Sequence, residues 1–153
     1  IRIGHLDDSS LVARRLSDVP MVLVGAPILL AEYGTPTNPE DLVDIPFVHY
    51  ASERVVQRLK LQRRNEEPVQ VITQAKLSTN NDQMMVSFAR AGQGLILLPR
   101  FMVETDLEDG RLREVLPEYR LFPERKLYAV FPHGRHLPLK TRALIDFLVD
   151  ELA

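Results

Sequence analysis

The sequence of 153 residues contains no cysteine and no tryptophan, and none of its apolar runs approaches the roughly 18 residues that cross a membrane. Without cysteine the chain forms neither disulfides nor thiolate metal sites, and with no visible signal peptide we expect a cytoplasmic protein. The net charge of −2 lacks the positive balance of a nucleic-acid-binding domain, so we expect this chain not to contact DNA itself.

Several catalytic and cofactor-binding motifs are also missing. There is no G-x-G-x-x-G fingerprint, no phosphate-binding G-x-x-x-x-G-K and no G-x-S-x-G nucleophile elbow. His133 and His136 flank a glycine turn without evident partner ligands, so we expect a surface turn there and no metal site. His49 lies within a predicted strand and is more simply packed or hydrogen-bonded than catalytic. We therefore predict no cofactor and no enzymatic activity.

The most informative stretch is residues 78–101, STNNDQMMVSFARAGQGLILLPRF. It predicts a helix that begins near Asp82 and buries an apolar stripe at spacings of three and four, made of Met84, Met85, Phe88, Ala89 and Ala91. Gly92 and Gly94 predict the helix exit, and the apolar run 95–98, stopped by Pro99, predicts a buried strand. A helix that leads into a buried strand is half of an α/β unit, so we predict an α/β fold.

The start of this helix and the end of the strand form a candidate ligand site. Asn80 or Asn81 can cap the helix, and Gln83 stands three residues after Asn80 as in a capping box. Free backbone N–H groups in a first helical turn favour an anion, and open α/β sheets bind ligands beyond the carboxyl ends of their strands. Arg100 is a candidate for pairing with an anionic ligand, and a surface salt bridge is the equal alternative. The candidate residues here are Ser78, Thr79, Asn80, Asn81, Asp82, Leu98, Pro99, Arg100 and Phe101.

The remaining chain alternates short strands with short helices. Gly4 ends the first strand and His5 follows it, and both join the candidate site, although a solvated loop histidine is the more ordinary interpretation of His5. The charged residues 62–68 predict an exposed turn between two strands. The other strands are expected at residues 1–4, 11–16, 21–24, 47–50, 55–61, 69–72, 75–77, 111–116 and 127–131, and the other helices at 28–33, from 38 onward, at 101–107 and from 138 onward.

Four segments together resemble LysR-type transcriptional regulators. IRIGHLDDSSLVARRL resembles a strand of that family, its acidic loop and the S-S-L-V-A-R-x-L that follows. GAPILLAEYGTPTNPEDL resembles its short helix, G-T-P turn and P-x-D-L helix start. The A-x-x-G-x-G segment and acidic helix of the family are similar to ARAGQGLILLPRFMVETDLEDGRL. Its closing strand and helix are similar to LYAVFPHGRHLPLKTRALIDFLVDEL. The resemblance covers nearly the whole chain and keeps the family's order.

The resemblance implies an effector-binding domain similar to type 2 periplasmic binding proteins. Such a domain has two α/β lobes joined by two crossover segments, with the ligand in the cleft between them. Carried onto this chain, the crossovers are Ser17–Asp18 and about Leu121 to Arg125. Residues 18–125 would be a complete second lobe, and residues 1–17 and 126–153 the remaining part of an incomplete first lobe. The family's winged helix-turn-helix and linker helix are absent from this sequence.

By the same resemblance, the chain would sense a small-molecule effector, such as an organic anion, within a homodimer or homotetramer. Operator DNA would be bound only through the absent N-terminal domain, and no membrane would be involved. One alternative is a periplasmic solute-binding protein that serves transport with the same fold. Another is an enzyme on this scaffold, which would need a convergent acid–base set that the sequence does not display.

Overall fold

The computed structural model describes residues 1–3, 11–50, 56–132 and 138–152. The chain divides into two compact units, unit 1 (residues 1–19 and 124–153) and unit 2 (residues 20–123), so the polypeptide passes from one unit to the other twice. This division lies close to the expected lobe boundaries at residues 18 and 125, and the identity of the units as lobes of a sensor stays a prediction. In the described part of the chain, no helix is long and apolar enough to span a membrane.

The described residues of unit 1 form a small antiparallel sheet with one helix. Its strand order is β1 (Arg2–Ile3), β10 (Arg125–Pro132) and β2 (Leu11–Val19). Helix α4 (Leu139–Leu152) packs on this sheet through Ile145, which is buried with Leu16 and Ala129. Because Leu144 and Phe147 remain more than half exposed, unit 1 presents apolar surface.

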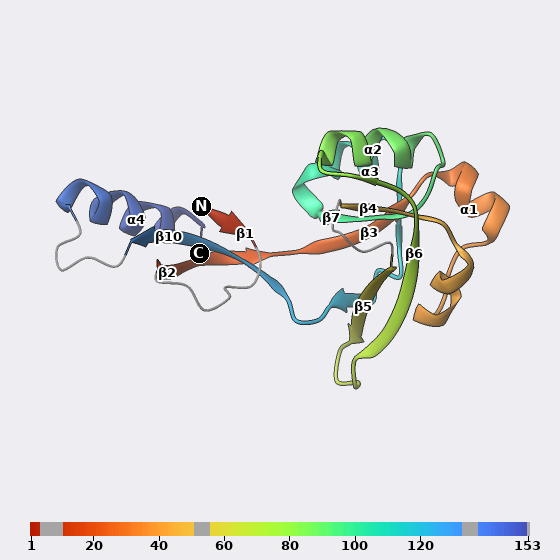
Figure 1. Cartoon of the computed structure of the whole chain (residues 1–153), viewed down its shortest axis with the longest axis horizontal. Coiled ribbons are helices and arrows are strands. Elements are labelled where there is room, and N and C mark those ends of the chain that lie inside the picture. The colour runs from red at the N-terminus through yellow and green to blue at the C-terminus, as the bar shows by residue number, and fades with distance from the viewer. Residues whose placement is uncertain (4–10, 51–55, 133–137, 153) are drawn as a thin grey trace. The chain divides into compact units, whose positions relative to one another are not determined.

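Unit 2 contains two sheets that meet along β4 (Figure 1). One has the order β7 (Ile96–Pro99), β3 (Met21–Gly25) and β8 (Arg113–Val115), all antiparallel. The other has the order β4 (Phe47–Tyr50), β6 (Val69–Thr79), β5 (Val56–Arg63) and β9 (Tyr119–Leu121), in which β4 and β6 are parallel. A parallel bridge between Phe47 and Leu95 joins the two sheets. Strands β6, β4 and β7 therefore run in the same direction.

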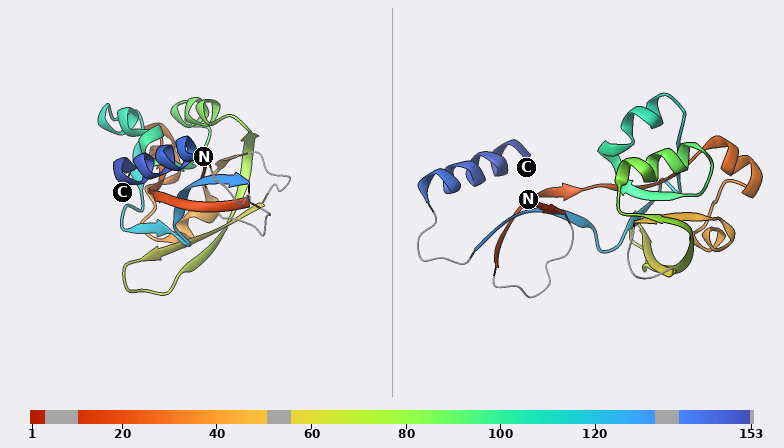
Figure 2. Two further views of the ribbon diagram at one scale, coloured as in Figure 1. Left: turned by 90° about the vertical axis from the view of Figure 1, so that its left-hand side faces the viewer. Right: turned by 45° about the horizontal axis from the view of Figure 1, so that its top comes forward.

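The helices of unit 2 bury both faces of these strands. Helix α2 (Asp82–Arg90) covers one face through Met85, Val86 and Ala89, which pack on β3, β4 and β7. Helix α3 (Glu104–Glu108) lies beside α2 in both figures (Figures 1 and 2). Helix α1 (Pro27–Tyr33) and the 3₁₀ helix η1 (Pro39–Asp44) contribute to the apolar cluster of the other face. The result is the α/β layering that the sequence predicts.

The glycine turn between α2 and β7 is confirmed. Gly92 has φ +70°, the left-handed conformation that a helix exit requires. A Cβ atom on Gly94 would lie 2.8 Å from the carbonyl oxygen of Pro46. This close approach allows Leu95 to donate its N–H to that same carbonyl at 2.8 Å and so to align β7 with β4.

Three expectations about the elements are wrong. The predicted strands 69–72 and 75–77 are one strand, β6, because its first half pairs with β5 and its last residues pair with β4. The predicted helix 101–107 is interrupted at Val103, between the 3₁₀ helix η2 (Arg100–Met102) and α3. Met84 and Ala91 are exposed rather than core, because the buried stripe of α2 runs through Met85, Val86 and Ala89.

Candidate functional site

Helix α2 begins at Asn81, whose side-chain Oδ1 accepts a hydrogen bond from the Met84 N–H at 3.0 Å. The capping box expected from Asn80 and Gln83 is therefore wrong, since the cap lies one residue later. The N–H of Asn81 in turn donates to Thr79 Oγ1 at 3.2 Å, which fixes the chain between β6 and the helix. The N–H groups of the first helical turn, including those of Asp82 and Gln83, have no acceptor within the helix, which makes this helix start a candidate position for an anion.

The carboxyl ends of three parallel strands meet beside this helix start. Tyr50 at the end of β4 is paired with Thr79 at the end of β6. The parallel Phe47–Leu95 bridge orients β7 like β4, so the end of β7 at Leu98 and Pro99 lies at the same edge of unit 2. The structure thus brings the segments 78–82 and 98–101 to one edge of unit 2. Gly4 and His5 lie outside the described residues.

Arg100 is engaged in a salt bridge. Its Nη1 lies 2.8 Å from Oε2 of Glu114 on β8, and this hydrogen bond raises the pKa of the Arg100 guanidinium. The backbone N–H of Arg100 donates to the Pro20 carbonyl at 2.9 Å, which ties η2 to the start of β3. The sequence left a salt bridge and an anionic ligand as equal alternatives for Arg100, and the structure has the salt bridge. An anionic ligand would have to compete with Glu114 for it.

Three further side chains lie at this edge that the sequence did not indicate as site residues. Tyr50 is 49% exposed at the end of β4, and Met84 is 48% exposed on the first turn of α2. Met21, at the start of β3, pairs with Pro99 at the end of β7. Pairing between strands distant in sequence places Tyr50 beside Thr79 and Met21 beside Pro99, so no local pattern indicates these two. Met84, which the sequence assigned to the buried stripe, is exposed instead, and its sulfur lies 3.9 Å from Thr79 Oγ1.

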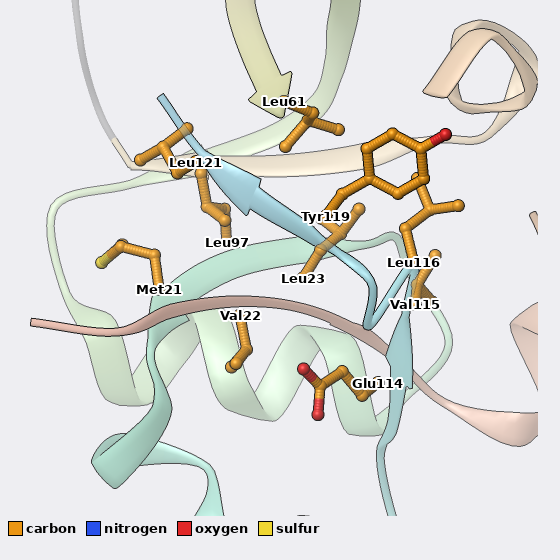
Figure 3. A pocket seen from close by; sticks show the side chains of 10 residues that line it. All are labelled: Met21, Val22, Leu23, Leu61, Leu97, Glu114, Val115, Leu116, Tyr119 and Leu121. Carbon is orange, nitrogen blue, oxygen red and sulfur yellow. The ribbon is translucent and has the colours of Figure 1, made fainter. Parts of the chain in front are cut away.

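A cavity in the core of unit 2 is too small for a ligand (Figure 3). It lies among apolar side chains of β3, β5, β7 and β9, with Glu114 at its margin. Its free space of about 10 Å³ is at the lower limit for a single water molecule. We interpret it as a packing gap of the core.

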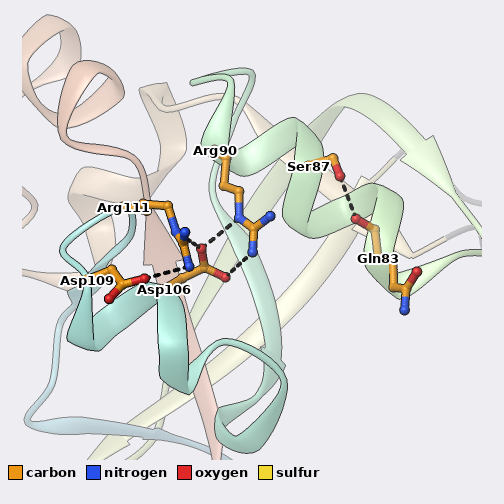
Figure 4. A network of polar contacts seen from close by, with 6 residues as sticks. All are labelled: Gln83, Ser87, Arg90, Asp106, Asp109 and Arg111. Carbon is orange, nitrogen blue, oxygen red and sulfur yellow. Dashed lines mark hydrogen bonds and ion pairs between the residues drawn. The ribbon is translucent and has the colours of Figure 1, made fainter.

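A buried carboxylate joins α2 to α3 (Figure 4). Asp106 accepts hydrogen bonds from Nε and Nη2 of Arg90 at 2.6 and 2.7 Å, and from Nε of Arg111 at 2.8 Å. The Arg90 hydrogen bond is the main reason that the pKa of Asp106 is lowered, and burial opposes this effect. Asp109 pairs with the other end of Arg111 at 2.8 Å. Since all four charges are paired with one another, this network is structural.

His49 is buried and hydrogen-bonded, as predicted. Its Nε2 lies 3.1 Å from Thr73 Oγ1, and that hydroxyl donates to the Gln57 carbonyl at 3.4 Å. Because the Thr73 hydroxyl donates its own proton to Gln57, Nε2 of His49 must donate to Thr73, which assigns the proton of the neutral ring to Nε2. Nδ1 has no hydrogen-bond partner within the described structure. Burial lowers the pKa of His49 and so favours the uncharged ring. No group of three potential metal ligands occurs among the described residues.

An α/β chain with parallel strand ends beside a capped helix start has the architecture of a small-molecule-binding domain. The family described as LysR substrate binding domain matches residues 1–153, and the chain belongs to it. It is 35% identical over 150 residues to the HTH-type transcriptional activator AaeR of Escherichia coli K12, covering 98% of this chain and 48% of that protein. The chain therefore spans about half the length of the curated relatives it matches.

Solved structures agree with this assignment. The full-length virulence activator AphB of Vibrio cholerae, a member of the LTTR family, is 28% identical with a TM-score of 0.77, over 99% of this chain and 51% of that one. The regulatory domain of CrgA, a LysR-type transcriptional regulator from Neisseria meningitidis, is 26% identical with a TM-score of 0.75, over 100% and 76%. The predicted fold is confirmed. The three relatives are transcriptional regulators, which favours a regulator over a transport protein or an enzyme.

Proposed function

We propose that this chain is the effector-binding domain of a LysR-type transcriptional regulator. It would bind a small organic anion at the strand edge of unit 2 and thereby control DNA binding and transcription by the full-length protein. The observation that carries the proposal is the convergence of the segments 78–82 and 98–101 at one edge, in a chain that matches this family from end to end. The expected position of this edge within a cleft between two lobes stays a prediction.

Backbone donors, rather than a cationic side chain, are proposed to hold the charged end of the effector. The N–H groups of Asp82 and Gln83 are aligned by the Asn81 cap, and the positive end of the α2 dipole adds to their attraction. Arg100 is already neutralised by Glu114.

The effector is proposed to act by shifting an equilibrium between conformations of an oligomer. It shifts that equilibrium only by the difference between its affinities for the two states. A homodimer or homotetramer, with operator DNA bound by a separate N-terminal domain, is proposed by analogy with the family. The cytoplasm is the proposed compartment.

The test is a thermal-shift screen of small organic acids, followed by calorimetric titration of each hit against three variants. Asn81→Ala removes the cap and should weaken binding, whereas Arg100→Ala should leave affinity within a few-fold of wild type. Asn38→Ala is a matched control, because Asn38 is also a helix cap of unit 2 but belongs to η1. Each cap substitution should cost about 1 kcal/mol of stability. Equal effector affinity in the Asn81 and Asn38 variants would remove the helix start from the site.

A further inference from the structure

We propose that the open side of strand β6 is a docking site for an extended segment of another protein. The segment adds to the sheet as a further strand and places one basic side chain beside Glu40. This surface runs along residues 70–74 of β6, whereas the candidate effector site lies at the carboxyl end of the same strand. The proposal therefore goes beyond the proposed function and does not rest on it.

The first half of β6 has a neighbouring strand on one side only, in the part of the chain that the structure describes. Strand β5 pairs with residues 69–74 of β6. Strand β4 lies on the opposite side of β6 and pairs with its last residues, 75–79. The side of β6 that faces away from β5 is therefore open along residues 69–74.

The backbone groups on this open side belong to alternate residues of β6. The N–H of Phe122 donates to the Lys60 carbonyl at 2.8 Å, so the backbone groups of Lys60 point away from β6. Because Lys60 is paired with Gln70, the backbone N–H and C=O of Gln70 point away from β5. The same holds for Ile72 and Gln74, two and four residues further along. These three residues have no hydrogen-bond partner on the open side among the described residues.

A groove of about 320 Å³ runs along this open side, between β6 and the 3₁₀ helix η1. Val43 of η1 and Ile72 of β6 are 55% and 47% exposed, so an added strand buries apolar surface on both walls. The walls share one core, because Leu42 of η1 and Val71 of β6 are buried in the same cluster. Addition of an extended peptide to an exposed strand is a recurring mode of peptide recognition. The groove lining consists of Glu40, Val43, Gln70, Val71, Ile72 and Gln74.

The sequence of β6 leaves this span unprotected against strand addition. Proteins usually block an open strand with proline or with charged side chains, above all lysine. Pro68 precedes β6, and Lys76 lies beyond the groove. The exposed side chains between them are two glutamines and one isoleucine. The open span is therefore residues 70–74, with one blocking residue beyond each end.

The charge of the groove decides the chemistry of the segment. Glu40 is the one charged side chain of its lining, and no described residue forms an ion pair with it. A lysine or arginine on the added strand complements this carboxylate. Arg58 and Lys60 are exposed on β5, about 10 Å from an added strand, and disfavour a run of several basic residues. The segment is therefore apolar with a single basic residue.

A second copy of this chain fits the groove less well than another protein. Its own open strand would present two glutamines and an isoleucine, none of which neutralises Glu40. This difference in charge complementarity assigns the groove to another protein.

Selection of phage-displayed random heptapeptides on the whole chain, followed by fluorescence-anisotropy titration of a selected peptide, tests the proposal. The selected sequences should alternate apolar residues and carry one lysine or arginine. Ile72→Pro should weaken binding about tenfold, because it removes the central N–H of the open side and spares the pairing with β5. Ile72→Thr is the matched control, since it keeps that N–H, and should bind within a few-fold of wild type.

The charge is tested by Glu40→Gln, which should weaken binding a few-fold, with Glu32→Gln on α1 as the control that leaves it unchanged. Circular dichroism shows whether each variant is folded. If Ile72→Pro is not, N-methylation of alternate peptide amides replaces it, because only the amides that face β6 should be needed for binding.

Four results would overturn the proposal. The first is a selection that yields no binding peptide, and the second is one that yields acidic sequences. The third is equal binding by folded Ile72→Pro and Ile72→Thr, or by peptides methylated on either set of amides. The fourth is a dimer of the chain alone in sedimentation velocity that Ile72→Pro dissociates, because the occupant would then be a second copy.

Discussion

The Asp106 side chain of α3 pairs with Arg90 at the end of α2 and with Arg111, three residues beyond α3. Its carboxylate is almost fully buried, at 3% side-chain exposure, while Arg90 and Arg111 are close to half exposed. Asp106→Asn keeps the shape of the side chain but removes the charge that both guanidinium groups need. We therefore expect this substitution to destabilise unit 2 without altering the fold of unit 1.

The magnitude follows from the three hydrogen bonds that Asp106 accepts. A hydrogen bond to a charged group contributes roughly 1.5–3 kcal/mol when both partners are buried. The two arginines are half exposed and recover water when the carboxylate is lost, so these values do not add in full. We expect a loss of about 2–3 kcal/mol in the free energy of unfolding.

Urea unfolding followed by far-ultraviolet circular dichroism measures this loss, and hydrogen exchange of peptides from α2 and α3 locates it. Asp109→Asn is the matched control, because Asp109 pairs with the same Arg111 but is half exposed. Its removal should cost at most about 0.5 kcal/mol. Equal unfolding midpoints for the two variants would refute the reasoning, because the buried position of Asp106 would then confer no advantage.

The acid dependence of stability provides a second measurement on the same residue. The folded-state pKa of Asp106 is lowered below its ordinary value, chiefly by the Arg90 hydrogen bond. Its contribution is therefore complete above about pH 5, beyond the unfolded-state pKa of about 3.9, and is lost as the pH falls through the folded-state pKa. The wild-type protein should lose stability more steeply than Asp106→Asn below pH 4.

Three further substitutions test other parts of unit 2. Burial lowers the pKa of folded His49, so wild-type stability should fall as the pH drops below about 6.5, the pKa of histidine in the unfolded chain. His49→Gln should remove this loss, measured as the difference in unfolding free energy between urea titrations at about pH 7.5 and 5.5. Gly94→Ala should cost about 2–3 kcal/mol, because the added Cβ would meet the Pro46 carbonyl. Gly110→Ala, with φ +71° and no atom within 4 Å, should cost only about 1 kcal/mol, and similar urea midpoints for the two glycine variants would contradict this.

Local sequence patterns predicted the elements whose ends are marked by a capping residue, a proline or a glycine. The Asn38–Pro39 start, the glycine exits and the apolar run of β7 depend on neighbours in sequence, and the structure has all of them. Strand β6 was predicted in two pieces because Thr73 and Gln74 interrupt its apolar residues. Thr73 is nevertheless buried, since the hydroxyl satisfies His49 and the Gln57 carbonyl. A polar residue with buried partners cannot be recognised from the strand alone.

The candidate site shows the same limit. The segments around Asn81 and Leu98 were predicted to lie together because both adjoin one helix–strand unit. Tyr50 belongs to a strand whose place between β6 and β7 is decided by long-range pairing. Tyr50 is 49% exposed, although Val48 on the same strand is buried in the cluster beneath α2. Neither fact is contained in the pattern FVHY.

Arg100 illustrates how such pairing changes the chemistry expected of a site. Its partner Glu114 lies on β8, which is separated from β7 by β3 in the sheet, and 14 residues separate the two side chains in sequence. The pairing of β3 with both neighbours brings the two charges to 2.8 Å. An effector carboxylate at Arg100 would either displace Glu114 or add a second anion to one guanidinium. The N–H groups of Asp82 and Gln83 impose neither cost, so recognition of an anion at this edge should depend more on Asn81 than on Arg100.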